Sequence, residues 1–187
     1  MKKVLLMTTS PTNGGNGDAL INAAAKVAKQ AQAEVTTVHM RDLQVHFCQA
    51  CYGCARTGVC VQNDDFRALL KQAHEADVII AEAPIYYNCM AAQMMTLINR
   101  LCCTFACKTY ELGVPKRVGM MLTCTGSEEA EMKHQVDLIL TLPSLSRSIT
   151  AYQTEVFTGC QEATTCQKTT AYLERAERLT RWTLEEE

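Results

Sequence analysis

The sequence predicts an α/β fold in which a parallel five-stranded sheet carries helices on both faces. Five short apolar runs alternate along the chain with segments of helical periodicity. Strands that alternate with helices in this way form parallel sheets. The 187 residues contain no linker, internal repeat or low-complexity segment. The whole chain, residues 1–187, is therefore predicted to be a single domain.

The strands are the apolar runs, which consist mainly of aliphatic and β-branched residues. In chain order, the predicted strands are Lys3–Thr9, Glu34–His39, Val78–Ala83, Arg117–Thr123 and Thr150–Phe157. The third is expected to stop at Pro84, because proline has no backbone N–H to donate to a neighbouring strand.

The helices are the segments with apolar residues three and four positions apart. The first is expected to have Asp18 as its N-cap, and the second Asn63 or Asp64. Later helices are expected over Met90–Phe105, Glu128–Leu140 and Thr164–Trp182. Met90–Phe105 is apolar on most of its circumference, which core burial or a subunit interface would explain. We expect an interface, because obligate interfaces are apolar.

Composition and charge argue against several kinds of partner. The net charge is −2 and no cluster of Lys and Arg occurs, so no nucleic-acid partner is expected. No segment approaches the length of a membrane span, and the apolar run after Lys2–Lys3 is too short for a signal peptide. No membrane partner is therefore expected. The 11 cysteines fit a reducing compartment, which favours a cytoplasmic location.

Four cysteines are arranged as C-x2-C-x2-C-x5-C, namely Cys48, Cys51, Cys54 and Cys60. The first three have the spacing with which ferredoxin-type loops hold an iron–sulfur cluster. Zinc sites usually pair two separated knuckles, so zinc fits this spacing less well. The spacing leaves a cluster, free or disulfide-bonded thiols, and zinc as alternatives. The surrounding loop, at about residues 44–63, is the only long irregular segment predicted, and such loops are commonly functional.

Three polar loops follow predicted strands whose carboxyl ends meet at one edge of a parallel sheet. Residues 10–18 combine glycines, hydroxyls and amides before a helix amino terminus, which suits a phosphate. They lack the P-loop signature, and a flexible turn would also explain the glycines. Residues 84–88 supply Tyr86 and Tyr87, which can flank a planar ring or simply pack. Residues 123–127 are small and polar.

In combination, these features resemble the flavodoxin-fold NAD(P)H-dependent FMN reductase and iron–sulfur flavoprotein family. The resemblance covers residues 2–126. Its motifs are the Ser10-Pro11 loop, the four-cysteine segment with Asp64-Asp65, the Ala83-Pro84-Ile85-Tyr86 loop, and the stretch from Gln93 to Arg100. It implies a flavodoxin-like sheet of order 2-1-3-4-5, and FMN with its phosphate on the first loop. The FMN-binding residues that it implies are Ser10, Thr12, Asn16, Gly17, Asp18, Pro84, Ile85, Tyr86, Tyr87, Asn88, Thr125 and Gly126.

The resemblance implies an FMN-dependent oxidoreductase that oxidises NAD(P)H and assembles as a homodimer or homotetramer. No catalytic side chain is expected, because the cofactor performs the redox chemistry. One alternative is an electron carrier with FMN and a 4Fe–4S cluster on the four cysteines, without a substrate of its own. Another is a thiol redox or metal-binding protein on the same scaffold. The expected partner is a small-molecule substrate or a redox partner protein.

Two residues depart from the family pattern in the first loop. Gly17 stands where the family commonly has a threonine hydroxyl for the phosphate. Asp18 would repel a phosphate beside it. We therefore expect Asp18 to point away from the phosphate and to cap the helix.

Overall fold

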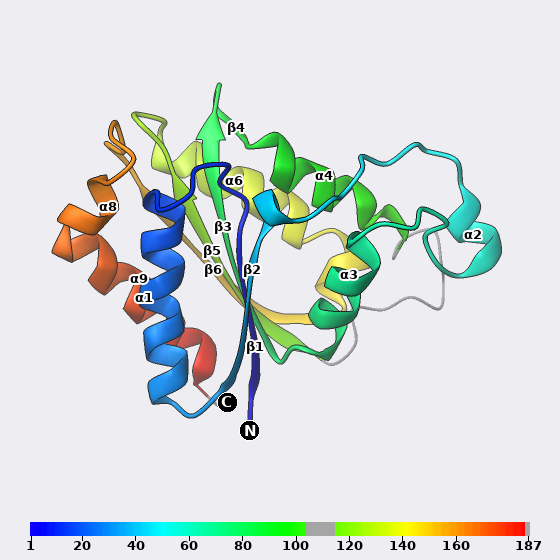
Figure 1. The fold of residues 1–187 in the computed structure, drawn as a ribbon, viewed down its shortest axis with the longest axis horizontal. Coiled ribbons are helices and arrows are strands. Elements are labelled where there is room, and N and C mark those ends of the chain that lie inside the picture. The colour runs from blue at the N-terminus through cyan, green and yellow to red at the C-terminus, as the bar shows by residue number, and fades with distance from the viewer. Residues whose placement is uncertain (104–114, 186–187) are drawn as a thin grey trace.

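Five parallel strands form the centre of the fold in the spatial order β2-β1-β3-β5-β6 (Figure 1). The strands are β1 (Lys3–Thr8), β2 (Glu34–His39), β3 (Val78–Tyr86), β5 (Lys116–Thr123) and β6 (Ile149–Phe157). The structure, a computed structural model, describes residues 1–103 and 115–185. The predicted parallel sheet and its order 2-1-3-4-5 are confirmed, since β5 and β6 are the predicted fourth and fifth strands.

Helices cover both faces of this sheet (Figure 1). One face carries α1 (Asn16–Gln30), α8 (Thr165–Lys168) and α9 (Thr170–Leu184). The other carries α3 (Phe66–Glu75), α4 (Ala92–Arg100), α6 (Glu129–Leu140) and α7 (Pro143–Ser146). A short 3-10 helix, η1 (Met40–Asp42), follows β2, and α2 (Gly53–Thr57) lies in the cysteine loop. Within the described part of the chain, no helix is both long and apolar enough to cross a membrane.

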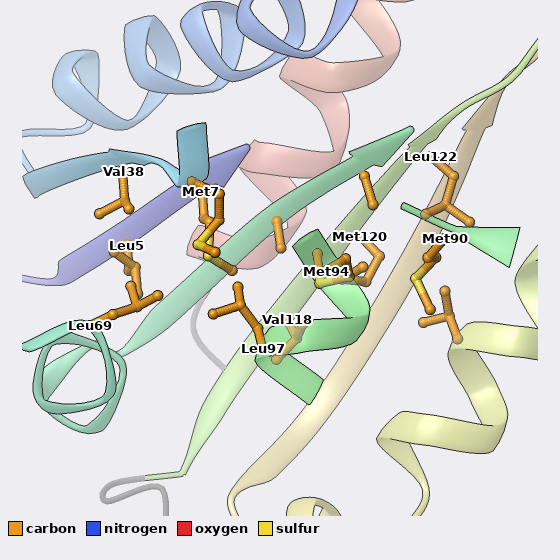
Figure 2. Close-up of a cluster of buried hydrophobic side chains, with 14 of the residues drawn as sticks. Leu5, Met7, Val38, Leu69, Met90, Met94, Leu97, Val118, Met120 and Leu122 are labelled. Carbon is orange, nitrogen blue, oxygen red and sulfur yellow. The ribbon is translucent and has the colours of Figure 1, made fainter. Parts of the chain in front are cut away.

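Each face of the sheet has its own apolar core. Along β1, Val4 and Leu6 pack toward α1, while Leu5 and Met7 pack toward the opposite face. Successive side chains of a strand point to opposite faces, so a strand buried on both sides must be apolar throughout. Figure 2 shows the core on the face that carries α3 and α4. Its residues include Leu5, Met7, Leu69, Met94, Leu97, Val118 and Met120.

Both predicted N-caps are wrong, since the N-cap of α1 is Gly15 and that of α3 is Asp65. Helix α1 begins two residues before Asp18, whose Oδ1 lies 2.9 Å from Arg41 Nη1. Helix α3 begins two residues after Asp64, and Asn63 lies still further from its start. Asp64 Oδ2 lies 2.6 Å from Arg100 Nη1. A helix cap is a local signal, whereas these pairs depend on the tertiary fold.

Strand β3 does not stop at Pro84 but continues to Tyr86. Pro84 lies opposite Thr123 of β5 in the strand register. The Pro84 carbonyl accepts a hydrogen bond from Ala91 N at 2.9 Å, so the backbone N and C=O of Pro84 point away from β5. Its missing N–H therefore removes no hydrogen bond from the β3–β5 ladder.

The predicted helix Met90–Phe105 is shorter and more deeply buried than expected. Met90 belongs to a two-residue strand, β4 (Cys89–Met90), which pairs antiparallel with β3. Met94 and Leu97 on α4 are only 4% and 5% exposed, so they belong to the core of the single chain. The part of the predicted helix from residue 104 onward lies outside the described residues.

The predicted final helix, Thr164–Trp182, is two helices. Thr169 separates α8 from α9, with extended backbone angles of φ −109° and ψ 92°. Its Oγ1 donates to Thr165 O at 2.8 Å. Threonine side chains that bond to nearby backbone groups compete with a continuous helix.

Candidate functional site

A cleft of about 400 Å³ opens at the carboxyl edge of the sheet, beside the point where strand order reverses between β1 and β3. Its walls are the loops after β1, β3, β5 and β6, which lie together at the top of Figure 1. Small-molecule sites commonly have volumes of roughly 300–1,000 Å³. The predicted FMN-binding residues that line the cleft are Ser10, Thr12, Asn16, Gly17, Pro84, Ile85, Tyr86, Tyr87 and Thr125.

Three other predicted residues, Asp18, Asn88 and Gly126, do not line the cleft. Asp18 instead fixes the first loop, since its Oδ2 accepts a hydrogen bond from Gly14 N at 2.6 Å. Burial acts to raise the pKa of Asp18, but the Arg41 guanidinium, the Gly14 N–H and the nearby His39 together outweigh it and hold the pKa below its ordinary value of 3.8. The negative charge of Asp18 is thus balanced outside the cleft.

The second loop is a tight hairpin turn between β3 and β4. Tyr87 and Asn88 occupy the two central positions, with φ angles of 51° and 57°. Positive φ at both positions defines a type I′ turn, which usually contains asparagine and glycine. Ser127 Oγ donates to Asn88 Oδ1 at 2.9 Å, and Gln135 Nε2 donates to Asn88 O at 2.5 Å. Asn88 therefore joins the second loop to the third loop and to α6.

A buried carboxyl group, Glu82 of β3, lies beneath the first loop and was not predicted as part of the site. Its Oε2 accepts a hydrogen bond from Thr8 Oγ1 at 2.6 Å, and its Oε1 accepts one from Thr123 Oγ1 at 3.0 Å. Burial raises the pKa of Glu82 to about 7. A single acidic residue inside an apolar strand was the signal in the sequence that could have identified it.

Glu82 explains why position 17 holds a glycine and not the threonine that the resemblance implies. A Cβ atom at position 17 would overlap the Glu82 carboxyl group and crowd Thr8 Oγ1. Glycine is the residue that permits such a close approach of backbone to a buried group. The first loop thus lacks a hydroxyl at this position because Glu82 occupies the space beneath it.

The loop after β6 forms a fourth wall that the sequence did not reveal. From this loop, Cys160, Gln161, Glu162 and Ala163 line the cleft. Thr123 and Cys124, at the end of β5, also line it. Asn16 ties this loop to the start of α1, because its Nδ2 donates to Glu162 O and its Oδ1 accepts from Cys166 N, both at 2.8 Å. The loop has no motif that would mark it as part of a site.

The predicted metal ligands lie on the loop that carries α2 and projects beyond α3 (Figure 1). Cys51 is exposed, and Cys48, Cys54 and Cys60 are half-buried. Burial raises the pKa of the nearby Cys102, and the thiols of Cys48 and Cys54 raise it further. Among the described residues, however, no three His, Cys, Asp or Glu side chains are arranged to hold a metal ion.

The cysteine loop is fastened to the core by Arg100 of α4, whose side chain is fully buried. Its Nη1 donates to His46 O at 2.8 Å, and its Nη2 donates to Cys60 Sγ at 3.3 Å. Both nitrogens also donate to the Asp64 carboxylate, at 2.6 and 2.9 Å. The guanidinium lies 4.4 Å from the centre of the Phe66 ring. One arginine thus holds both ends of the loop.

In sequence, the chain is similar to two iron–sulfur flavoproteins. The iron–sulfur flavoprotein of Archaeoglobus fulgidus is 36% identical over 92 residues, which are 49% of this chain and 42% of that protein. The iron–sulfur flavoprotein of Methanosarcina thermophila is 29% identical over 137 residues, 73% of this chain and 70% of that protein. The alignment with the Archaeoglobus protein thus spans less than half of that relative.

Solved structures show the same fold at low sequence identity. An NAD(P)H:quinone oxidoreductase from Methanothermobacter marburgensis has a TM-score of 0.74 at 14% identity, over 100% of this chain and 98% of that chain. An azoreductase from Bacillus anthracis has a TM-score of 0.67 at 16% identity, over 97% of this chain and 100% of that chain. The sequence pattern of the NADPH-dependent FMN reductases matches residues 2–160. This match covers most of the chain, which therefore belongs to the NADPH-dependent FMN reductase family.

Proposed function

We propose that the chain binds FMN in the cleft at the carboxyl edge of the sheet and is an FMN-dependent oxidoreductase that accepts electrons from NAD(P)H. The observation that carries the proposal is the convergence of the loops after β1, β3 and β5 on one cleft. Family membership supports the same conclusion. In this proposal residues 1–187 are a single FMN-binding domain, with the cysteine loop at about residues 44–63 as an insertion.

The amino end of α1 is the proposed phosphate site. Thr12, Asn16 and Gly17 line the cleft there. Backbone N–H groups and the helix dipole at such an end favour an anion. Arg41 balances the charge of Asp18, which reduces the repulsion that Asp18 would otherwise exert on a phosphate.

The second and third loops are the proposed site of the flavin ring. Pro84, Ile85, Tyr86 and Thr125 line this part of the cleft. FMN, when bound, supplies the chemistry that accepts a hydride and passes electrons on singly or in pairs. The protein positions the ring and excludes side reactions, so no side-chain acid or base is assigned.

Titration of the apoprotein with FMN and with riboflavin tests the phosphate site. The Thr12→Val variant keeps the side-chain shape but removes the hydroxyl. A hydrogen bond to a charged group contributes about 1.5–3 kcal/mol, so FMN affinity should fall by about tenfold or more while riboflavin affinity is unchanged. Thr37→Val on the exposed side of β2 is the matched control. Equal wild-type affinity for FMN and riboflavin would remove the phosphate assignment, and binding of neither would refute the proposal.

Anaerobic mixing of the FMN-loaded protein with NADH or NADPH tests the proposed electron donor. Loss of the oxidised-flavin absorbance within seconds is expected with at least one of them. An unchanged spectrum with both would favour an electron carrier without its own small-molecule substrate.

We also propose, as a second function, that Cys48, Cys51, Cys54 and Cys60 hold a 4Fe–4S cluster, which would act as a one-electron outlet. The spacing of the four cysteines within one loop favours this proposal, as does the hydrogen bond from Arg100 to Cys60. Thiolates are the ligands that such clusters take. The names of the two relatives agree with it.

Anaerobic reconstitution followed by iron and acid-labile sulfide analysis tests the cluster. Near-stoichiometric iron should be lost in Cys51→Ser or Cys54→Ser while FMN stays bound, and Cys89→Ser on β4 should behave like the wild type. A wild-type protein that takes up no iron would contradict the cluster. If it also bound no FMN, a thiol redox or metal-binding protein on this scaffold would be the better account.

We further propose a homodimer or homotetramer in the cytoplasm, with a small-molecule substrate or a redox partner protein as electron acceptor. Met94 cannot form the interface because it is buried in the core. Tyr87, Leu138 and Leu142 are large apolar or aromatic side chains that remain exposed. Light scattering after size exclusion should show an oligomer, and Leu138→Glu should shift it to smaller species. A monomeric wild type would contradict the proposal.

A further inference from the structure

Two cysteines in the fourth wall of the cleft form a close thiol pair. Cys160 Sγ lies 3.7 Å from Cys166 Sγ. A disulfide has an S–S distance of about 2.05 Å, so the two sulfur atoms need to approach by less than about 2 Å. Cys160 is half-buried and lines the cleft, whereas Cys166 on α8 is completely buried. One sulfur is therefore reachable from the cleft and the other is shielded behind it.

The electrostatics of the pair distinguish the two thiols. The hydrogen bond from Cys166 lowers the pKa of Cys160, and its effect exceeds that of burial. The same hydrogen bond, together with burial, raises the pKa of Cys166. The thiolate is the nucleophilic form of cysteine. The accessible member of the pair is thus the one that ionises more readily.

The backbone around the pair is held in place by contacts with the first loop. Cys166 N donates to Asn16 Oδ1 at 2.8 Å, and Gln167 Nε2 donates to Gly14 O at 2.7 Å. Cys160 N donates to Cys124 O at 2.9 Å. Both cysteines are therefore anchored to separate, ordered segments. Their proximity is a property of the folded protein as well as of their spacing in the sequence.

We propose that Cys160 and Cys166 form a thiol–disulfide exchange site that reacts with low-molecular-weight disulfides. The Cys160 thiolate attacks one sulfur of the small disulfide, forms a mixed disulfide and releases the other sulfur as a thiolate. Cys166 then passes its proton to the small thiolate released in the first step and attacks Cys160 Sγ. The protein disulfide forms, the second small thiolate leaves, and the two protein thiols have reduced one disulfide to two thiols. The exchange uses no atom of FMN, although Cys160 is reached through the cleft proposed for FMN.

The chain sequence allows a direct test with oxidised glutathione as the probe. Trypsin cleaves after Arg147 and Lys168, so Cys160 and Cys166 share the peptide Ser148–Lys168, which contains no other cysteine. The folded apoprotein is incubated with oxidised glutathione, quenched with acid, alkylated under denaturing conditions, digested and analysed by mass spectrometry. The peptide should lose two hydrogen atoms and take up no alkyl group. Intramolecular disulfide should exceed the Cys160–glutathione adduct by at least about tenfold, because neighbouring thiols react at high effective concentration.

Exposed Cys89 provides the internal control, because the tryptic peptide that contains it has no second cysteine. It should stop at the glutathione adduct. In Cys166→Ala the adduct on Cys160 should accumulate, and in Cys160→Ala the buried Cys166 should stay reduced. A wild-type Ser148–Lys168 peptide that keeps two alkylatable thiols while Cys89 is modified would overturn the proposal. So would preferential glutathione addition to Cys166. Circular dichroism checks that Cys160→Ala and Cys166→Ala are folded. The result for the wild-type peptide tests the proposal even if a variant does not fold.

Discussion

Replacement of Glu82 by glutamine should make the protein more stable at neutral and alkaline pH and should remove a pH dependence of its stability. Glu82 is fully buried between Thr8 and Thr123, and burial raises its pKa from an ordinary value of 4.5 to about 7. The folded state therefore binds a proton more tightly than the unfolded state does. Below pH 4.5 the Glu82 carboxyl group is protonated in both the folded and the unfolded state, so its titration does not lower the free energy of unfolding there. As pH rises from 4.5 to 7 the unfolded state ionises first, and the free energy of unfolding falls.

The size of this loss follows from the change in pKa. One pKa unit corresponds to about 1.4 kcal/mol, so the rise to about 7 amounts to roughly 3 kcal/mol above pH 7. Glutamine has nearly the same shape and stays neutral. The difference in unfolding free energy between Glu82→Gln and wild type should therefore grow by about 3 kcal/mol between pH 4 and pH 8.

Urea unfolding of the apoprotein at several pH values measures this difference. The change of the difference with pH is the decisive quantity, because any altered packing of the glutamine adds a constant offset. Glu34→Gln replaces an exposed glutamate on β2 and should show no such trend. If the wild type and Glu82→Gln respond in parallel between pH 4 and pH 8, the buried carboxyl group does not titrate as inferred.

Three further predictions concern other buried groups. In Gly17→Thr, the new side chain should overlap the Glu82 carboxyl group beneath the first loop and lower the free energy of unfolding in urea by about 1–3 kcal/mol. The same change should weaken FMN binding in a fluorescence titration, and an unchanged affinity would contradict the close approach of Gly17 to Glu82. Arg100→Met should leave Asp64 buried without its ion-pair partner and cost about 3–5 kcal/mol by urea unfolding. Lys71→Met on the exposed surface of α3 should change little. Burial lowers the pKa of Lys116 from 10.5 to about 8, so the amine binds its proton less tightly in the folded state than in the unfolded state. The free energy of unfolding should therefore rise by up to about 3 kcal/mol as pH increases from 8 to 10.5. Lys116→Met, measured in the same buffers, should lack that rise.

The sheet was predictable because its information is local and repeated. Each strand is an apolar run, and a run such as Leu5–Met7 must be apolar on both faces when helices cover both sides of the sheet. The convergence of three loops followed from the parallel topology alone. Helix starts were less predictable, because Asp18 and Asp64 are typical capping residues whose actual partners, Arg41 and Arg100, are distant in the sequence.

The least predictable part of the site was the wall that follows β6. Its residues, including Cys160 and Glu162, have no spacing or motif that distinguishes them from an ordinary loop. They reach the cleft because Asn16 binds the Glu162 carbonyl from the start of α1 and because Cys160 N donates to Cys124 O. Glu82 gave a signal, an acidic residue within an apolar strand, but its position beneath Gly17 required the fold. The cluster, the nicotinamide donor and the oligomeric state stay predictions.

The hairpin turn at Tyr87 and Asn88 has a consequence for the energetics of ligand binding. A tyrosine at a φ of 51° is held in a sparsely populated backbone region, which costs on the order of 1–3 kcal/mol. The hydrogen bonds to Asn88 from Ser127 and Gln135 help to offset this cost during folding, before any ligand arrives. The backbone of this turn is therefore already ordered before a ligand binds beside it. Ligand binding does not have to order the turn, so little of the binding free energy is lost to backbone entropy there.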